Sequence, residues 1–210
     1  MITRSEENYL KAIFSVHMQT KKNVSTNDIA NLLDTSPASV TEMIKKLQEK
    51  KLVIYEKYNG VRLSSKGEDN AIKTIRKHRL WETFLVNKLD FSWSEVHDVA
   101  EQLEHIKSNK LTNKLDHFLN YPKFDPHGDP IPTKNGVFNF QERISIFEMD
   151  INEEGIIMGV SLDNKDFLDH LTKLKISIGT RVRVLEQIKF DQSMKITYDS
   201  RTEHISKEIA

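Results

Sequence analysis

The sequence predicts a mainly α-helical fold that ends in a small β-rich domain. Three observations indicate this. Apolar residues recur at helical spacing through most of 4–119, a short hairpin pattern interrupts them at 52–63, and short strand patterns dominate from about residue 143. An irregular connector that holds four of the five prolines, residues 121–136, separates the helical and β-rich parts. We therefore expect three domains, at residues 1–70, 71–136 and 137–210.

The first domain is expected to begin with a helix over about 4–19, followed by two short helices. Ser25 and Ser36 are suited to cap the starts of these two helices, and Pro37 fits the first helical position after Ser36. The second short helix has apolar residues at the spacing i, i+3, i+4, i+7, which are Val40, Met43, Ile44 and Leu47.

A hairpin is expected next, with strands at 52–57 and 61–63 joined by a two-residue turn at Asn59-Gly60. Two short helices followed by a hairpin are typical of a winged helix-turn-helix, whose second helix enters the DNA major groove. Short polar and small apolar side chains near that helix can read bases, and basic ones can meet phosphates. The alternative is a winged helix used only for protein contacts. The candidate DNA-binding residues are Thr26, Ser36, Pro37, Ala38, Ser39, Thr41, Lys46, Lys57 and Arg62.

Three further helices are expected in the middle of the chain. Ser65 is suited to cap a long helix over about 66–88, and Ser92 or Ser94 a helix over about 94–110. A shorter helix around 112–119 follows. The β-rich end is expected to form a small barrel. Its strands are expected at 144–147, 155–160, 181–185 and 195–198, with a helix at 164–174.

Side chains of metal-ligand type share one face of the helix expected at 94–110. His97, Glu101, Glu104 and His105 fall within an arc of roughly 100° on a helical wheel. His78 and Glu82 are spaced i,i+4 on the preceding helix. Solvated helix faces or salt bridges are the ordinary alternatives. The combined set, with no cysteine in the chain, suits Mn²⁺ or Fe²⁺, and Zn²⁺ remains possible in vitro.

Composition and missing motifs exclude several classes of protein. Lys and Arg together number 31, as do Asp and Glu, so net charge does not indicate a partner. No apolar stretch approaches a membrane span and the N-terminus lacks a signal-peptide pattern, so we expect a cytoplasmic protein without a membrane partner. No catalytic triad order, phosphate-binding glycine loop or HExxH motif is present. We therefore expect no enzymatic activity and no small organic substrate.

Five segments occur in a specific order along the chain, and these are VTEMIKKLQEKKLV, LSSKG, RKHRLWE, VHDVAEQLEH and PHGDPIP. Together they resemble the DtxR/MntR family of metal-dependent transcriptional repressors, over essentially the full length. The resemblance implies a homodimer with a winged helix domain, a helical dimerisation and metal-binding domain, and a C-terminal SH3-like (FeoA-like) domain. It also implies metal-activated repression at palindromic operators of metal-uptake genes. The alternatives are a DNA-binding protein with a purely structural metal site, or a metalloenzyme of the helical layer.

Position by position, the resemblance implies a primary metal site made of Asn8, Glu101, Glu104 and His105. Glu101 stands where iron-type members have cysteine and manganese-type members have glutamate, which favours Mn²⁺ over Fe²⁺. Asn8 stands where manganese-type members have aspartate, so its neutral oxygen would be a weaker ligand. Lys11 stands where some manganese-type members have a second glutamate, which argues against a dinuclear site of that kind.

The resemblance also implies an ancillary metal site. Three of its ligands come from the helical domain, and these are His78, Glu82 and His97. Two completions remain open, one from the C-terminal domain and one from the loop before it. The first pair is Asp163 and Asp166, and the second pair is Asp125 and His127. The ordinary reading of both pairs is that they are exposed loop residues.

Overall fold

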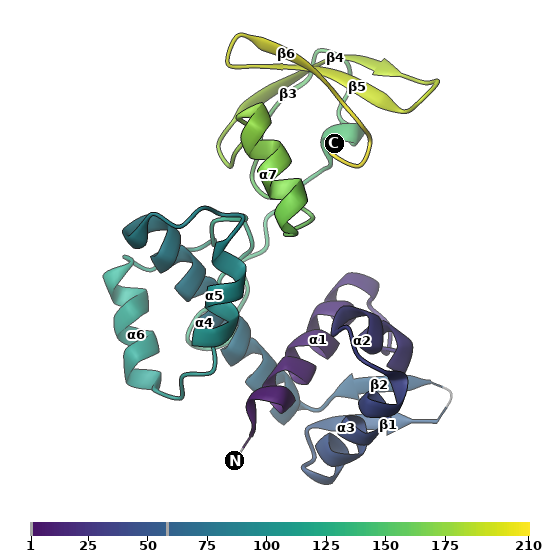
Figure 1. The fold of residues 1–210 in the computed structure, drawn as a ribbon, viewed down its shortest axis with the longest axis vertical. Coiled ribbons are helices and arrows are strands. Elements are labelled where there is room, and N and C mark those ends of the chain that lie inside the picture. The colour runs from purple at the N-terminus through teal and green to yellow at the C-terminus, as the bar shows by residue number, and fades with distance from the viewer. Residues whose placement is uncertain (1, 58) are drawn as a thin grey trace.

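The structure is a computed structural model that describes residues 2–57 and 59–210. Figure 1 shows three units: a winged unit, a helical unit beside it, and a C-terminal unit at the far end. The winged unit contains α1 (Arg4–Thr20), α2 (Thr26–Leu32), α3 (Pro37–Glu49), β1 (Val53–Glu56) and β2 (Gly60–Leu63). The helical unit contains α4 (Ser65–Leu89), α5 (Val96–Leu103) and α6 (Asn109–Phe118). The C-terminal unit contains η1 (Ile146–Glu148), β3 (Glu154–Ile156), α7 (Lys165–Leu174), β4 (Arg181–Ile188), β5 (Ser193–Tyr198) and β6 (Arg201–Ile205).

The winged unit follows its local capping signals. Ser25 caps α2 in a capping box with Asp28, and Ser36 caps α3 with Pro37 in its first turn. Residues from α1, α2, α3 and both strands share one apolar core. Because α1 and α3 belong to this core, the position of α1 determines the position of α3. The most buried members include Leu10, Ile13, Ile29, Val40, Leu47, Leu52 and Val61.

The hairpin differs from the prediction of a two-residue Asn59-Gly60 turn. Glu56 pairs with Gly60, so the loop has three residues, one of which, Tyr58, lies outside the described residues. The Glu56 carbonyl accepts a hydrogen bond from the Asn59 N–H at 3.0 Å and Gly60 follows with a positive φ, which is the usual form of a three-residue hairpin loop. Beyond the hairpin, the backbone of Val24 exchanges two hydrogen bonds with Val61. Gly60 has a φ of +89°, and a Cβ there would lie 2.6 Å from the Val24 carbonyl oxygen.

Helix α4 connects the winged unit to the helical unit. Its cap is Ser64 and not the predicted Ser65, because Ser64 Oγ accepts a hydrogen bond from the backbone N–H of Gly67 at 3.1 Å. Gly67 packs directly against the backbone of Leu52. A Cβ at residue 67 would lie 2.0 Å from the Leu52 carbonyl oxygen. The start of α4 is therefore fixed to the winged unit by close backbone packing.

Helix α5 is shorter than the predicted 94–110. Its N-cap is Glu95, which makes no side-chain capping bond, so neither Ser92 nor Ser94 caps it. It ends at Leu103 with Glu104 as the C-cap, and α6 starts at Asn109, before the predicted 112, because Ser108 caps it. His105 therefore lies beyond the end of α5, so the predicted face with four ligands on one helix is interrupted.

The C-terminal unit is a four-stranded antiparallel sheet in the order β3-β4-β5-β6, packed with α7 (Figure 1). The prediction of a strand at 144–147 is wrong, because Ser145 instead caps the short helix η1. Strand β6 was not predicted. The mainly α-helical fold with a small β-rich C-terminal unit is otherwise confirmed. Within the described residues, no helix is long and apolar enough to cross a membrane.

Candidate metal centre

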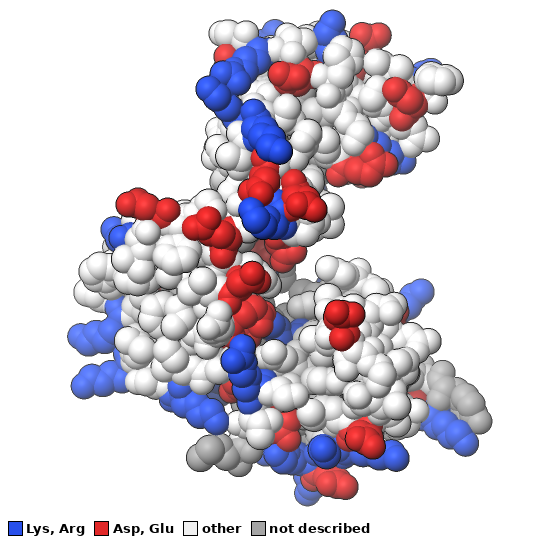
Figure 2. Space-filling view, in the orientation of Figure 1, with Lys and Arg blue, Asp and Glu red and all other residues white. Residues whose placement is uncertain are grey.

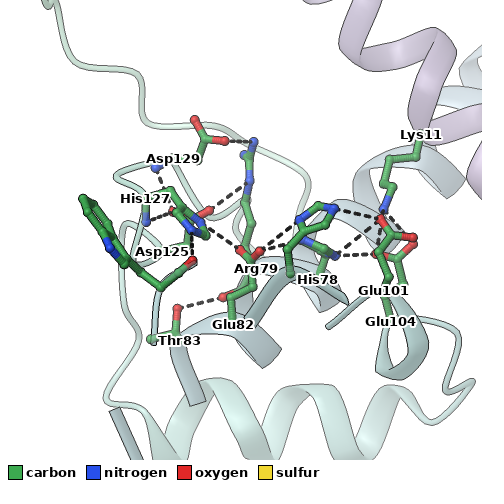
Figure 3. Close-up of polar contacts among 12 residues, drawn as sticks. Lys11, His78, Arg79, Glu82, Thr83, Glu101, Glu104, Asp125, His127 and Asp129 are labelled. Carbon is green, nitrogen blue, oxygen red and sulfur yellow. Dashed lines mark hydrogen bonds and ion pairs between the residues drawn. The ribbon is translucent and has the colours of Figure 1, made fainter. Parts of the chain in front are cut away.

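Ligand-type side chains gather where α1, α4, α5 and the loop at 121–136 meet (Figure 3). Among the described residues, three groups have ligand atoms within 4.8 Å of one another. The first cluster is Glu101, Glu104 and His105, the bridging cluster is His78, His97 and Glu101, and the second cluster is Glu82, Asp125 and His127.

The first cluster contains two carboxylates that share one ammonium group. Glu104 is fully buried at the C-terminal end of α5, and both of its oxygens accept hydrogen bonds from Lys11 Nζ at 2.9 Å. Lys11 Nζ also pairs with Glu101. Since Lys11 lies on α1, this ion pair joins the winged unit to the helical unit. Burial alone would raise the pKa of Glu104, but His78 and Lys11 outweigh it and lower that pKa.

His105 is oriented as a metal ligand in the first cluster. Its Nδ1 lies 2.5 Å from a carboxylate oxygen of Glu7 on α1. An ionised carboxylate can only accept, so Nδ1 carries the proton and Nε2 keeps its lone pair in the neutral ring. His105 Nε2 is buried and has no hydrogen-bond partner among the described residues, and the same is true of Asn8 Oδ1. Each of these two buried acceptors has a lone pair left over for a cation. Asn8 also lines an open pocket with Tyr9 and Thr35.

His78 connects the first and second clusters through two carboxylates. Its Nδ1 lies 2.7 Å from Glu104 and its Nε2 lies 2.9 Å from Glu82. Burial by itself would lower the pKa of His78, but Glu82 and Glu104 outweigh it and raise the pKa to about 9. His97 is close by, with ring centroids 4.8 Å apart. Because a ligating imidazole must lose this proton, protons compete with metal here.

The second cluster is built by the loop at 121–136. His127 Nε2 donates to the backbone carbonyl of Trp93 at 2.7 Å, which leaves Nδ1 facing Glu82 at 3.7 Å. Asp125 accepts backbone hydrogen bonds from His127 and Asp129 at 2.9 Å. Burial, then the charge of Glu82, raises the pKa of Asp125 to about 7.

The structure brings together most of the predicted ligands but groups them differently. His78 and His97 lie near Glu82, as predicted, and also approach Glu101 of the first cluster. Glu82 in addition groups with the loop pair Asp125 and His127. The alternative completion, Asp163 and Asp166, lies exposed just before α7 and in its first turn, outside all three clusters of the described chain. The structure therefore favours the loop pair. No described contact joins Asn8 to the first cluster.

Sequence reasoning missed the groups that orient or neutralise the ligands. Glu7 holds His105, Lys11 holds Glu104, and the carbonyl of Trp93 holds His127. Arg79 lies 3.4 Å from Asp125 and donates to Asp129. Each of these groups lies within a few positions of a predicted ligand along the chain, and that closeness was the only local signal. The residues that they contact lie far away along the chain.

The candidate DNA-binding residues lie on the surface of the winged unit. Ser36, Pro37, Ala38, Ser39, Thr41, Lys46, Lys57 and Arg62 are exposed, and Thr26 is half-buried. Three hydroxyls are engaged locally. Ser36 caps α3 and shares a hydrogen bond of 2.9 Å with the hydroxyl of Ser39, and Thr41 donates to the carbonyl of Pro37 at 2.8 Å. Lys and Arg side chains line the lower edge of this unit in Figure 2, with a few acidic side chains between them.

Comparison with known proteins agrees with this arrangement. Three family profiles cover most of the chain: the iron dependent repressor N-terminal DNA binding domain at 1–61, the iron dependent repressor metal binding and dimerisation domain at 64–133, and the FeoA domain at 145–210. A probable metal transport system membrane protein of Chlamydia trachomatis is 44% identical over 72 residues, which are 34% of this chain and 16% of that longer protein.

Two relatives match over most of their own length. The HTH-type transcriptional regulator MntR of Listeria welshimeri is 34% identical over 126 residues, 58% of this chain and 87% of the relative. A manganese-dependent transcriptional repressor solved in complex with manganese is 33% identical, with a TM-score of 0.88 over 98% of this chain and 96% of that one. The chain therefore belongs to the DtxR/MntR family of metal-dependent transcriptional repressors.

Proposed function

We propose that this chain is a homodimeric transcriptional repressor that is activated by a divalent metal and binds palindromic operators of metal-uptake genes. The observation that carries the proposal is the position of the first cluster. Its carboxylates and His105 belong to the helical unit, and their partners Glu7 and Lys11 belong to α1 of the winged unit. Ligand chemistry at this junction can therefore control how the DNA-binding unit is held.

The donor set favours Mn²⁺, with Fe²⁺ as the alternative and Zn²⁺ possible in vitro. Asn8, Glu101, Glu104 and His105 would supply oxygen and nitrogen atoms and no sulfur, which suits hard or borderline cations. A divalent cation held by these residues would supply an electrostatic link between α1 and the end of α5. Similarity to a manganese-dependent repressor supports this choice of metal.

Within the chain, the link would act on DNA binding through the core of the winged unit. Leu10 and Ile13 on α1 pack in the same core as Val40 and Leu47 on α3. Because α3 moves with α1, restraining α1 restrains both recognition helices of a dimer. Two half-sites separated by whole turns of DNA require one fixed spacing of those helices. A restraint that holds the two recognition helices at this spacing therefore favours operator binding.

An aromatic strip on the helical unit supports the proposed dimer. Trp81, Phe84 and Phe118 form successive ring contacts at 5.8 and 6.1 Å. Phe118 and Tyr121 remain 61% and 62% exposed. The strip packs on a small apolar cluster whose buried members, among the described residues, are Leu80, Leu115 and Ile131. We therefore infer that a second copy of the chain covers the exposed rings. The comparisons support a DNA partner.

The experiment is a DNA-binding assay on EDTA-stripped protein with selected genomic fragments, with and without Mn²⁺, Fe²⁺ under anaerobic conditions, or Zn²⁺. We expect recovery of a palindromic site only when metal is present, with the protein sedimenting as a dimer. Equal recovery without metal would instead indicate a purely structural metal site. Failure to recover DNA under every condition would contradict the proposal and reopen the metalloenzyme alternative.

A further inference from the structure

Lys11 enters the first cluster from across a domain junction. Its Nζ donates to both oxygens of Glu104 and pairs with Glu101, while its own side chain is 19% exposed. Figure 3 shows Lys11 and His78 reaching Glu104 from different sides. The ammonium group therefore holds, from α1, the carboxylates that a metal in this cluster would need.

We propose that Lys11 is a built-in cation that competes with the divalent metal for Glu101 and Glu104, and thereby raises the metal concentration that the protein requires. This inference rests on the metal site proposed above. A carboxylate lone pair that accepts an N–H from Lys11 is not available to a metal. A divalent cation that took the remaining lone pairs would lie next to the positive charge of Lys11, so metal binding at the first cluster favours displacement of the ammonium group from at least one carboxylate.

The neutral ligands explain why a metal can still win this competition. Lys11 satisfies the two carboxylates but leaves Asn8 Oδ1 and His105 Nε2 buried without hydrogen-bond partners among the described residues. An ammonium group can only donate hydrogen bonds and carries a single positive charge. A divalent ion can coordinate carboxylates and neutral nitrogen or oxygen atoms at the same time. Lys11 has a flexible stem and reaches solvent, so it can leave without rearrangement of α1.

The same contact has a second consequence for the metal-free protein. Lys11 joins α1 to the end of α5, as the metal would, so removing it weakens the metal-free junction. A competing cation therefore predicts two opposite effects of its removal, lower stability without metal and tighter binding of metal. A lysine with a purely structural role predicts only the first effect.

The test is calorimetric titration of the EDTA-stripped full chain with Mn²⁺. All proteins carry His127→Gln, so that the second cluster does not contribute. The variants in that background are Lys11→Met, Lys11→Arg and the control Lys77→Met. Lys77 has the same charge and acts on Glu7 and Glu104 through Coulomb interaction rather than a hydrogen bond. Thermal unfolding of the same samples is recorded with and without Mn²⁺.

We expect Lys11→Met to bind Mn²⁺ about tenfold more tightly or better, the change that corresponds to one charge-assisted hydrogen bond. Its unfolding temperature should fall without metal and rise more than that of the parent when metal is added. Lys11→Arg should stay close to the parent, and Lys77→Met should tighten binding far less. If Lys11→Met does not fold, Lys11→Gln carries the same expectation.

Unchanged or weaker Mn²⁺ binding in Lys11→Met would overturn the inference. Equal tightening in Lys77→Met would also overturn it, because the effect would then be general electrostatics. Absence of Mn²⁺ binding in every protein would overturn the proposed function and this inference with it. If the parent binds Mn²⁺ tightly and Lys11→Met binds it no more tightly, this inference is overturned and the proposed function stands.

Discussion

Replacing Glu104 by glutamine is expected to destabilise the junction between α1 and the helical unit by about 3–5 kcal/mol, the cost of removing one partner of a buried ion pair. The side chain of Glu104 is fully buried and accepts hydrogen bonds from Lys11 at 2.9 Å and from His78 at 2.7 Å. Glutamine keeps the shape of the side chain but removes its charge. Its amide NH₂ group, itself a donor, would face the N–H donor of Lys11 or of His78. Charge-assisted bonding to these two partners, at about 1.5–3 kcal/mol for each partner, gives the same magnitude.

The assay is urea unfolding of metal-free protein followed by tryptophan fluorescence, which reports on Trp81 and Trp93 in the helical unit. The matched control is Glu101→Gln, since Glu101 is 25% exposed and shares only the Lys11 contact at hydrogen-bond distance. We expect Glu101→Gln to cost about 1 kcal/mol, as for a partly exposed ion pair. A loss for Glu104→Gln no larger than for Glu101→Gln would refute the reasoning.

Three further predictions follow from the same contacts. Asn8→Asp should tighten Mn²⁺ binding about tenfold in calorimetry, because a carboxylate replaces a neutral ligand, and unchanged affinity would exclude position 8 from the site. Gly67→Ala should lower the free energy of unfolding in guanidinium by about 2 kcal/mol, since its Cβ would lie 2.0 Å from the Leu52 carbonyl oxygen, and a neutral result would contradict this packing. Lys46→Ala should weaken DNA binding at all sequences and reduce the slope of log K against log salt by about 1, whereas an unchanged slope would place Lys46 away from phosphate.

The sequence predicted those elements whose ends are fixed by local chemistry. Ser25 and Ser36 each satisfy backbone N–H groups three residues away, so the starts of α2 and α3 could be located without tertiary information. Helix α5 has no side-chain cap at Glu95, and its start was misplaced. The hairpin loop was also misjudged, because an Asn-Gly pair is compatible both with a two-residue turn and with a three-residue loop followed by a glycine of positive φ.

The proximity of the candidate ligands could be predicted for a similar reason. Glu101 and Glu104 are neighbours on one helical turn, and spacing alone placed them together. The groups that position or neutralise them could not be predicted, since Lys11 lies 90 residues from Glu101 and Glu7 lies 98 residues from His105. The likeness to a known family helped with the ligands but left the choice between the loop pair and the C-terminal pair open.

The C-terminal unit is tied to the second cluster through the backbone of Gly128. The N–H of Val160 donates to the carbonyl of His127 at 3.0 Å, and a Cβ on Gly128 would lie 2.1 Å from the Met158 carbonyl oxygen. Gly128 also has a φ of +88°, so Gly128→Ala should push the loop at 121–136 away from the C-terminal unit.

Because His127 and Asp125 are held by this loop, we expect Gly128→Ala to weaken Mn²⁺ binding at the second cluster and to leave the first cluster unchanged. Calorimetric titration would then show loss of one class of sites. Gly136→Ala is the matched control, since its φ is +81° but the nearest atom to its Cβ is a side-chain carbon of Ile72 at 3.5 Å. Equal effects of the two substitutions would mean that backbone strain alone acts, and that contact with the C-terminal unit does not hold the second cluster in place.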